Sequence, residues 1–287
     1  MTWHRTPAVF MRGGTSKAVV FKVEDLPMDQ AERDALLLAA MGVPDPNGRQ
    51  LDGMGGGLSS LNKVCIVGPS SHPAAQVDFT FAQLGVDDPV VDYGGNCGNM
   101  SSAIGPFAVE EGLVACPPDG EAAVVIHNTN TGKLIRARFP VENGALASEG
   151  DLAIDGVAGT AAPIRLEFLE PGGAKTGRLL PTGNAVDLLD VLGLGRIEVS
   201  CVDAANPAIF VRAADIGMTG AELPADLDAN AEFLTRMEAI RSAGAKAMGM
   251  APAASVPKVA LVCAPVAAPT LSEIGRASCR ERVSNCV

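Results

Sequence analysis

The helix predicted over residues 100–109 is apolar on nearly every side, and it constrains the fold more than any other feature of the chain. It begins within the stretch YGGNCGNMSSAIGPF at residues 93–107, and its apolar positions are Met100, Ala103, Ile104, Phe107, Ala108 and Val109. A helix with apolar residues all round must be surrounded by other elements. We therefore expect a β-sheet that wraps around this helix, with a kink or a restart at Gly105–Pro106.

A single cysteine, Cys97, stands just before this helix among glycines and asparagines. A thiol at a helix N-terminus meets backbone N–H groups without an intrahelical acceptor and the positive end of the helix dipole, and both favour the thiolate. Gly94, Gly95 and Gly98 would let the backbone approach a small anion, because no Cβ stands in the way. The simpler interpretation stays open at this point, because most cysteines are small buried hydrophobic side chains.

The length of 287 residues suits two domains of ordinary size. Thirty-two glycines and twenty prolines are spread along the chain, which predicts many tight turns and short strands. We therefore expect a β-rich α+β protein. The net charge of −11 argues against nucleic acid and anionic membrane surfaces as partners, because both select a basic protein face.

The seven cysteines form no C-x-x-C pair, and neither they nor the three histidines show metal-ligand spacing. We expect reduced thiols, no metal site and a cytoplasmic protein. The first twenty residues lack the apolar core of a signal peptide, and the longest later apolar run, Val259–Ala268, is too short to span a bilayer.

Hydrophobic periodicity predicts the other elements. Helices are expected at 28–41 and 228–248, and strands at 7–10, 18–23, 63–67, 77–81, 89–93, 122–126, 133–139, 164–169, 197–202, 208–211 and 258–263. Asn206–Pro207 is expected to form a turn, and the Gly- and Pro-rich segment 170–187 to connect two domains. The expected division is 1–186 for the first lobe, 187–272 for a partial second lobe, and 273–287, which shows no period, for a non-native tail.

Two loops are rich in glycine. MRGGTSK at 11–17 has the composition of an anion site, with backbone N–H groups, two hydroxyls and an ammonium, but without the residue order of a Walker loop. DGMGGGLSSLNK at 52–63 lacks the spacing of a dinucleotide fingerprint and ends at Lys63. Each loop also has a plain structural interpretation, as a polar hairpin turn and as a turn before a solvated lysine.

The motifs FMRGGTSK, DGMGG with the downstream Lys63, and YGGNCGNMSSAIGPF together resemble the PrpF family of isomerases, supported by PTGNAVD at 181–187 and DAANPAIFV at 203–211. The resemblance runs from about residue 5 to about residue 270. It implies the diaminopimelate-epimerase-like fold, in which two similar lobes each curl a sheet around a central helix and the active site lies between them. Family members continue beyond residue 272, so we expect the second lobe to be incomplete.

The resemblance also implies site residues and a substrate class. Lys63 and Cys97 would be the catalytic residues, and the carboxylate-binding set would be Arg12, Gly13, Gly14, Thr15, Ser16, Lys17, Ser59, Ser60, Asn62, Asn96, Gly98 and Asn99. Family activities are 2-methylaconitate cis-trans isomerisation, 4-oxalomesaconate tautomerisation and allylic isomerisation of methylitaconate or aconitate, all without a cofactor. Many members have Thr-Ser-Lys where this chain has Leu61-Asn62-Lys63, a change expected to alter substrate preference.

The expected function is thus a cofactor-independent isomerase that moves a proton and a double bond in a small unsaturated di- or tricarboxylate, and a homodimer is compatible with the sequence. In this hypothesis Lys63 exchanges a proton at one carbon and Cys97 at the other. Two alternatives stay open. A racemase of the same fold would need a second reactive thiol, whereas Cys201 and Cys263 lie in strand-like runs and are expected in the core. A carboxylate-binding accessory protein to an aconitase-type enzyme would need no catalytic pair.

Overall fold

The computed structural model describes residues 5–251, 256–264, 267–269 and 274–276. The chain divides into two compact units between Glu170 and Pro171, whereas the sequence placed the division after residue 186. The segment 171–186 joins the second unit because it hydrogen-bonds to a strand there. The amide of Gly173 donates to the carbonyl of Asp203 (2.8 Å), and the amide of Asp203 donates to Leu179 (2.9 Å).

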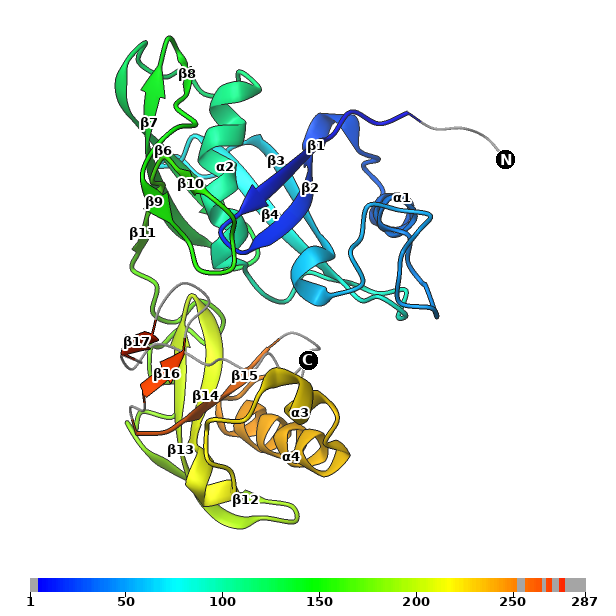
Figure 1. Ribbon diagram of the computed structural model, residues 1–287, viewed down its shortest axis with the longest axis vertical. Coiled ribbons are helices and arrows are strands. Elements are labelled where there is room, and N and C mark those ends of the chain that lie inside the picture. The colour runs from blue at the N-terminus through cyan, green and yellow to red at the C-terminus, as the bar shows by residue number, and fades with distance from the viewer. Residues whose placement is uncertain (1–4, 252–255, 265–266, 270–273, 277–287) are drawn as a thin grey trace. The chain divides into compact units, whose positions relative to one another are not determined.

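The first unit is a nine-stranded sheet that wraps around helix α2 (Gly98–Glu110), as Figure 1 shows. The strand order is β1-β2-β3-β4-β6-β7-β11, with β5 paired to β4 and β8 to β7. The bounds are β1 Val9–Gly13, β2 Ser16–Lys22, β3 Lys63–Pro69, β4 Val77–Leu84, β5 Val91–Asp92, β6 Gly120–Asn128, β7 Lys133–Glu142, β8 Ala145–Leu146 and β11 Arg165–Leu169. Helix α2 contacts both ends of this sheet, β1 and β11, so the prediction of a surrounded helix is confirmed.

Helix α2 stays continuous through Pro106 instead of breaking there. Its close approach to β7 explains the preceding glycine. A Cβ at Gly105 would lie 2.8 Å from Phe139 Cε1 and 2.9 Å from Ala137 Cβ, distances that real Cβ contacts do not reach. Gly105 therefore lets the helix pack directly on the strand, and Phe107 is almost fully buried in the same core.

The opposite face of the sheet is covered by α1 (Gln30–Met41). Along β2 the side chains alternate, so that Val20 belongs to the core around α2 and Val19 to the core under α1. Helix α1 begins after Asp29, whose side chain accepts from the amide of Glu32, and ends at Gly42 in the left-handed conformation. The unit also contains a short ribbon of β9 (Leu152–Ala153) and β10 (Thr160–Ala161), and the 3-10 turns η1 (Val23–Asp25) and η2 (Ser59–Leu61).

The second unit has a four-stranded sheet in the order β12-β13-β14-β15. Its elements are β12 Asp187–Val191, β13 Gly195–Ala204, β14 Asn206–Arg212, η3 Ala213–Ile216, α3 Pro224–Asp228, α4 Ala231–Ala247 and β15 Lys258–Val262. One face packs against α4 through Phe233, Met237 and Ile240. Asn206 and Pro207 begin β14, and the turn lies one residue earlier at Ala205 (φ 62°), so the predicted turn is displaced. Strand β12 was not predicted; it begins at Asp187, the last residue of the segment that was interpreted as a connection.

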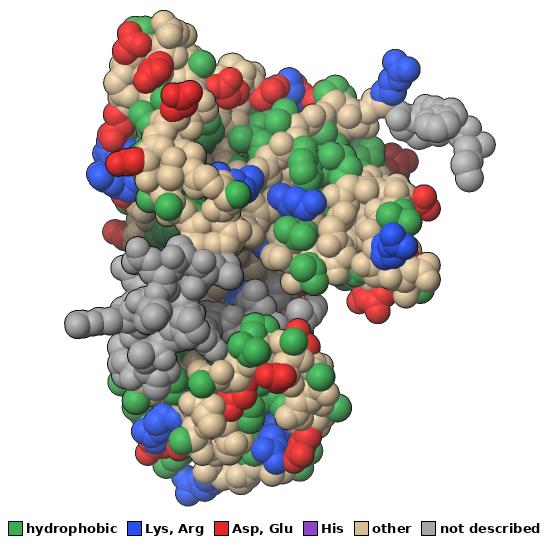
Figure 2. Space-filling model, in the orientation of Figure 1, with side chains coloured by type: hydrophobic (Ala, Val, Ile, Leu, Met, Phe, Trp, Pro, Cys, Tyr) green, Lys and Arg blue, Asp and Glu red, His purple; other side chains and the backbone are tan. Residues whose placement is uncertain are grey.

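Part of the expected tail is structured, because β17 (Ile274–Arg276) pairs with β16 (Ala267–Pro269). Residues 273 and 277–287, the rest of that expected tail, lie outside the described residues. On the face drawn in Figure 2, acidic and basic side chains are interspersed over the described part of the chain. Within the same part, none of the helices has both the length and the apolar character that crossing a membrane requires.

Candidate active site

Lys63 and Cys97 meet inside the first unit. Lys63 Nζ lies 3.4 Å from Cys97 Sγ and 3.0 Å from Ser16 Oγ. The exposed fractions are 8% for Lys63, 9% for Cys97 and 3% for Ser16, so the solvated-lysine interpretation is wrong. The three residues come from the starts of β3, α2 and β2, which the curled sheet brings together.

The backbone of Cys97 explains why its thiol is available to the lysine. Cys97 is the N-cap residue of α2 with φ −113° and ψ 104°, and its side chain makes no capping hydrogen bond. Its carbonyl instead accepts from the amide (3.0 Å) and the hydroxyl (2.9 Å) of Ser101. Because the carbonyl anchors the helix start, the thiol is left to contact Lys63.

The β1–β2 hairpin lies against the start of α2. Its turn is only Gly14-Thr15, since Gly13 pairs with Ser16. A Cβ at Gly13 would lie 2.5 Å from the Asn99 carbonyl oxygen, and one at Gly14 would lie 2.6 Å from Asn99 Oδ1. Both glycines therefore permit this contact, in which Asn99 Nδ2 donates to Thr15 Oγ1 (3.1 Å) and Ser16 Oγ (3.3 Å).

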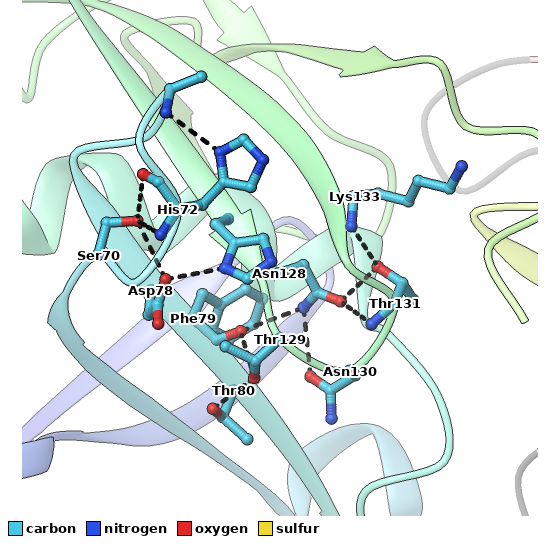
Figure 3. A network of polar contacts seen from close by, with 12 residues as sticks. Ser70, His72, Asp78, Phe79, Thr80, Asn128, Thr129, Asn130, Thr131 and Lys133 are labelled. Atoms are coloured by element: carbon cyan, nitrogen blue, oxygen red, sulfur yellow. Dashed lines mark hydrogen bonds and ion pairs between the residues drawn. The ribbon is translucent and has the colours of Figure 1, made fainter.

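Two asparagines hold the loop that precedes Cys97: Asn128 at the end of β6 and Asn130 in the turn that follows. Figure 3 shows both asparagines and the contact of Asn128 with the Phe79 carbonyl. Asn128 Nδ2 donates to Asn96 Oδ1 (3.2 Å) and to the Phe79 carbonyl (3.4 Å). Asn130 Nδ2 donates to the Tyr93 carbonyl (2.9 Å). These positioning residues were not predicted, because their signal in the sequence is the polar turn NTNTG at 128–132, which resembles any turn.

The other thiols differ from Cys97 in environment. Burial raises the pKa of the Cys65 thiol well above its ordinary value. In the second unit burial raises the pKa of Cys201 to about 11, with nearby Asp187 adding to the effect. The prediction that Cys201 is a core residue is confirmed, whereas Cys263 is exposed after β15. Neither buried thiol is suited to act as a second nucleophile or base.

Several residues of the expected carboxylate-binding set lie together at the helix start. Gly98 and Asn99 are exposed there, and Asn96 is buried next to them. A Cβ at Gly98 would have only Phe168 Cζ within reach, at 3.8 Å, so the fold itself does not require glycine at this position. The open space leaves the first amides of α2 accessible, and such amides bind anions.

Two expected residues are not brought to this site. Asn62 is fully buried and holds the protein together instead, because it accepts from Gln50 Nε2 (3.0 Å) and donates to the Leu84 carbonyl (3.3 Å). The ammonium of Lys17 lies over the Phe10 ring, 5.1 Å from its centroid, on the face of β2 opposite Ser16. Ser59 and Ser60 form η2, beside β2.

A hollow of about 220 Å³ adjoins the start of α2 within the first unit. Its lining is Arg12, Gly14, Gly98, Asn99, Ser102, Leu152, Ile154, Val157, Ala158, Gly159, Thr160, Ala161, Ala162, Ile164 and Leu166. The hollow reaches Gly98, the residue after Cys97, but neither Lys63 nor Cys97 lines it. No group of three metal-ligating side chains occurs among the residues with described positions.

Comparison with known proteins gives consistent similarities. The PrpF protein family matches residues 3–278. The 3-methylitaconate isomerase of Eubacterium barkeri is 49% identical over 86% of this chain and 64% of its own length, and the 2-methyl-aconitate isomerase of Shewanella oneidensis is 41% identical over 91% and 70%. A crystal structure of methylitaconate-delta-isomerase matches with a TM-score of 0.71 and 46% identity, over 96% of this chain and 72% of that one.

These matches confirm the expected diaminopimelate-epimerase-like fold class. The chain spans between 64% and 72% of the length of these three proteins.

Proposed function

This chain belongs to the PrpF protein family, and we propose that it is an isomerase that moves a proton and a double bond within a small unsaturated di- or tricarboxylate without a cofactor. The observation that carries the proposal is the contact of 3.4 Å between Lys63 Nζ and Cys97 Sγ. A buried amine and thiol side by side can each exchange a proton with a substrate carbon. The names of the similar proteins, methylitaconate and methylaconitate isomerases, support the substrate class.

The reaction needs a base, an acid and a site for the developing negative charge. One residue of the pair removes a proton from the carbon next to the double bond, and the electrons of that C–H bond form a dienolate that extends into a carboxylate. The other residue delivers a proton to the far carbon of the allyl system. The substrate formula is unchanged, and the pair returns to its starting protonation by transferring one proton between its members or through solvent.

The carboxylate that takes up the charge is proposed to bind at the start of α2. The first amides of the helix, at Gly98 and Asn99, have no intrahelical acceptor. The Asn99 side-chain amide and the Ser16 hydroxyl stand beside them, 3.3 Å apart. Ser16 also contacts Lys63, so one hydroxyl joins the carboxylate site to the proton-transferring pair.

The proposal is tested by following deuterium uptake from D₂O by NMR over a panel of aconitates, itaconates and mesaconates. Uptake at an allylic carbon together with movement of the double bond is expected. Exchange at the α-carbon of an amino acid would indicate a racemase instead, and binding without any exchange would favour the accessory protein. Cys97→Ser should lower the exchange rate by about 10²–10⁴-fold, and a variant with near-full activity would overturn the assignment of Cys97.

The cytoplasmic location and the homodimer stay predictions. A reducing compartment is consistent with a mechanism that needs Cys97 as a free thiol.

A further inference from the structure

The hollow beside α2 has one polar wall and one apolar wall. The polar wall is made by Arg12, Asn99 and Ser102. The apolar wall comes from the β9–β10 ribbon and the strand that follows it, with Leu152, Ile154, Val157, Ile164 and Leu166. This ribbon carries none of the residues assigned above to proton transfer or to carboxylate binding.

Arg12 is suited to bind a carboxylate in this hollow. Its Nη1 donates to the Gly14 carbonyl (2.8 Å), which fixes the guanidinium and uses one of its five N–H donors. Over the part of the chain that the structure describes, no carboxylate forms an ion pair with Arg12, and none of the residues that line the hollow is acidic. The remaining donors therefore stay available for an anion, and a guanidinium binds carboxylates through two parallel hydrogen bonds.

The apolar wall restricts what can stand next to that carboxylate. Ile154 and Val157 are half-buried and close the ribbon turn, where the Val157 amide donates to the Ile154 carbonyl (3.0 Å). A second charged group against these side chains would lose its hydration without gaining a partner, which is costly. A methyl group there would instead leave water for an apolar surface. The volume equals roughly seven water molecules at about 30 Å³ each, which fits one end of a small dicarboxylate.

We propose that this hollow is the subsite that selects the alkyl substituent of the substrate, with Arg12 on a carboxylate and Ile154 and Val157 around the neighbouring methyl group. The inference rests on the proposed function and adds to it the residues that discriminate between substrates. It assigns the β9–β10 ribbon as the element that determines specificity.

The test uses maleate, citraconate and dimethylmaleate, which carry zero, one and two methyl groups on the same dicarboxylate. Their dissociation constants are measured by calorimetry at neutral pH, so the result does not depend on turnover. The wild-type chain should bind at least one methylated member about 10- to 200-fold more tightly than maleate, the usual effect of one methyl group in an apolar pocket. Ile154→Ala and Val157→Ala should reduce that ratio towards one.

Arg12→Gln should act differently, because it removes a charge that contacts all three ligands. It should weaken the three by a similar factor, about ten- to a hundred-fold, and leave their ratios unchanged. Val90→Ala is the matched control, since Val90 is 50% exposed, belongs to the same unit and does not line the hollow. Thermal unfolding of each variant shows that it is folded.

Unchanged ratios in both ribbon variants, or no preference for a methyl group in the wild type, would overturn the inference. If the chain isomerises a substrate of the panel but binds methylated maleates no more tightly than maleate, the proposed function stands and only the subsite is refuted. If it prefers methylated maleates but isomerises no substrate, the subsite stands and the catalytic proposal is contradicted.

Discussion

The two units share one arrangement of strands and an outer helix, and they differ on the other face of the sheet. In the first unit β1 is antiparallel to β2, β2 is parallel to β3, and α1 connects the parallel pair. In the second unit β13, β14 and β15 pair in the same way, with α4 in the connection. No repeat is visible in the amino-acid sequence, so the likeness is one of topology.

The inner faces of the two sheets differ in what they meet. In the first unit Ala18, Val20 and Cys65 face α2 and are fully buried. In the second unit the face turned away from α4 carries Leu188, 56% exposed, and Phe210, 37% exposed. The parallel strand pair and its connecting helix, which both units share, therefore act as a scaffold. The candidate site lies in the first unit, where the additional helix α2 begins against the face of the sheet opposite α1.

Lysines at matching positions make this comparison testable. Lys63 is the first residue of β3 and Lys258 the first residue of β15, the strands that follow the outer helices. Lys63→Met should slow isomerisation by about 10²–10⁴-fold, because it removes an acid–base group but keeps the apolar stem. Lys258→Met should change the rate less than about twofold.

Initial rates with the best panel substrate measure this difference, and thermal unfolding shows that both variants are folded. A similar loss in both variants would mean that the second unit supplies part of the chemistry. The comparison between a catalytic unit and a scaffold unit would then fail.

Much of the fold could be predicted because its signals are local. The all-round apolar pattern of α2 predicted a surrounding sheet, and Asp29 and Gly42 marked the ends of α1. The segment 170–187 was expected to connect two domains, but from Pro171 on it belongs to the second unit, because its backbone hydrogen-bonds to Asp203 in β13. No local pattern encodes that contact. Ala205 takes the turn that was predicted at Asn206–Pro207, since strand pairing decides the position of a tight turn there and local preference does not.

The candidate site could be predicted only in part, because side-chain direction depends on register. Cys97 followed from its place before a helix, whereas its partner Lys63 came from a family resemblance. Asn62 precedes Lys63 directly, and alternation along an extended segment turns it to the other side, where it is buried. Asn128 and Asn130 support the Cys97 loop from more than thirty residues away, and no local pattern encodes such a contact.

Glycines in α2 and α4 test how tightly a helix of each unit packs on its sheet. Gly105→Ala in α2 should destabilise the first unit by about 1–2 kcal/mol, because the new Cβ meets Ala137 and the Phe139 ring, and a gain of about 1 kcal/mol in helix propensity offsets only part of the overpacking. Gly244→Ala in α4 should cost at least as much, because its Cβ would lie 2.7 Å from Cγ1 of Ile209 and closer still to Cδ1. Ile209 is fully buried and β-branched, so its side chain has little room to rotate away.

Urea unfolding of the two glycine variants measures both costs. A neutral Gly244→Ala would show that α4 is packed on its sheet less rigidly than α2.

The smallest expected effect concerns the caps of the two outer helices. Asp29 accepts from the amide of Glu32, and Asn230 accepts from the amide of Phe233, each at 3.0 Å. If α1 and α4 play the same structural part, Asp29→Ala and Asn230→Ala should each cost about 1 kcal/mol of unfolding free energy. Isomerisation should be unchanged in both, because neither cap contacts Lys63 or Cys97. Asp29→Asn and Asn230→Asp keep an accepting oxygen and should restore stability, whereas a loss of activity in either alanine variant would show that an outer helix does more than support its sheet.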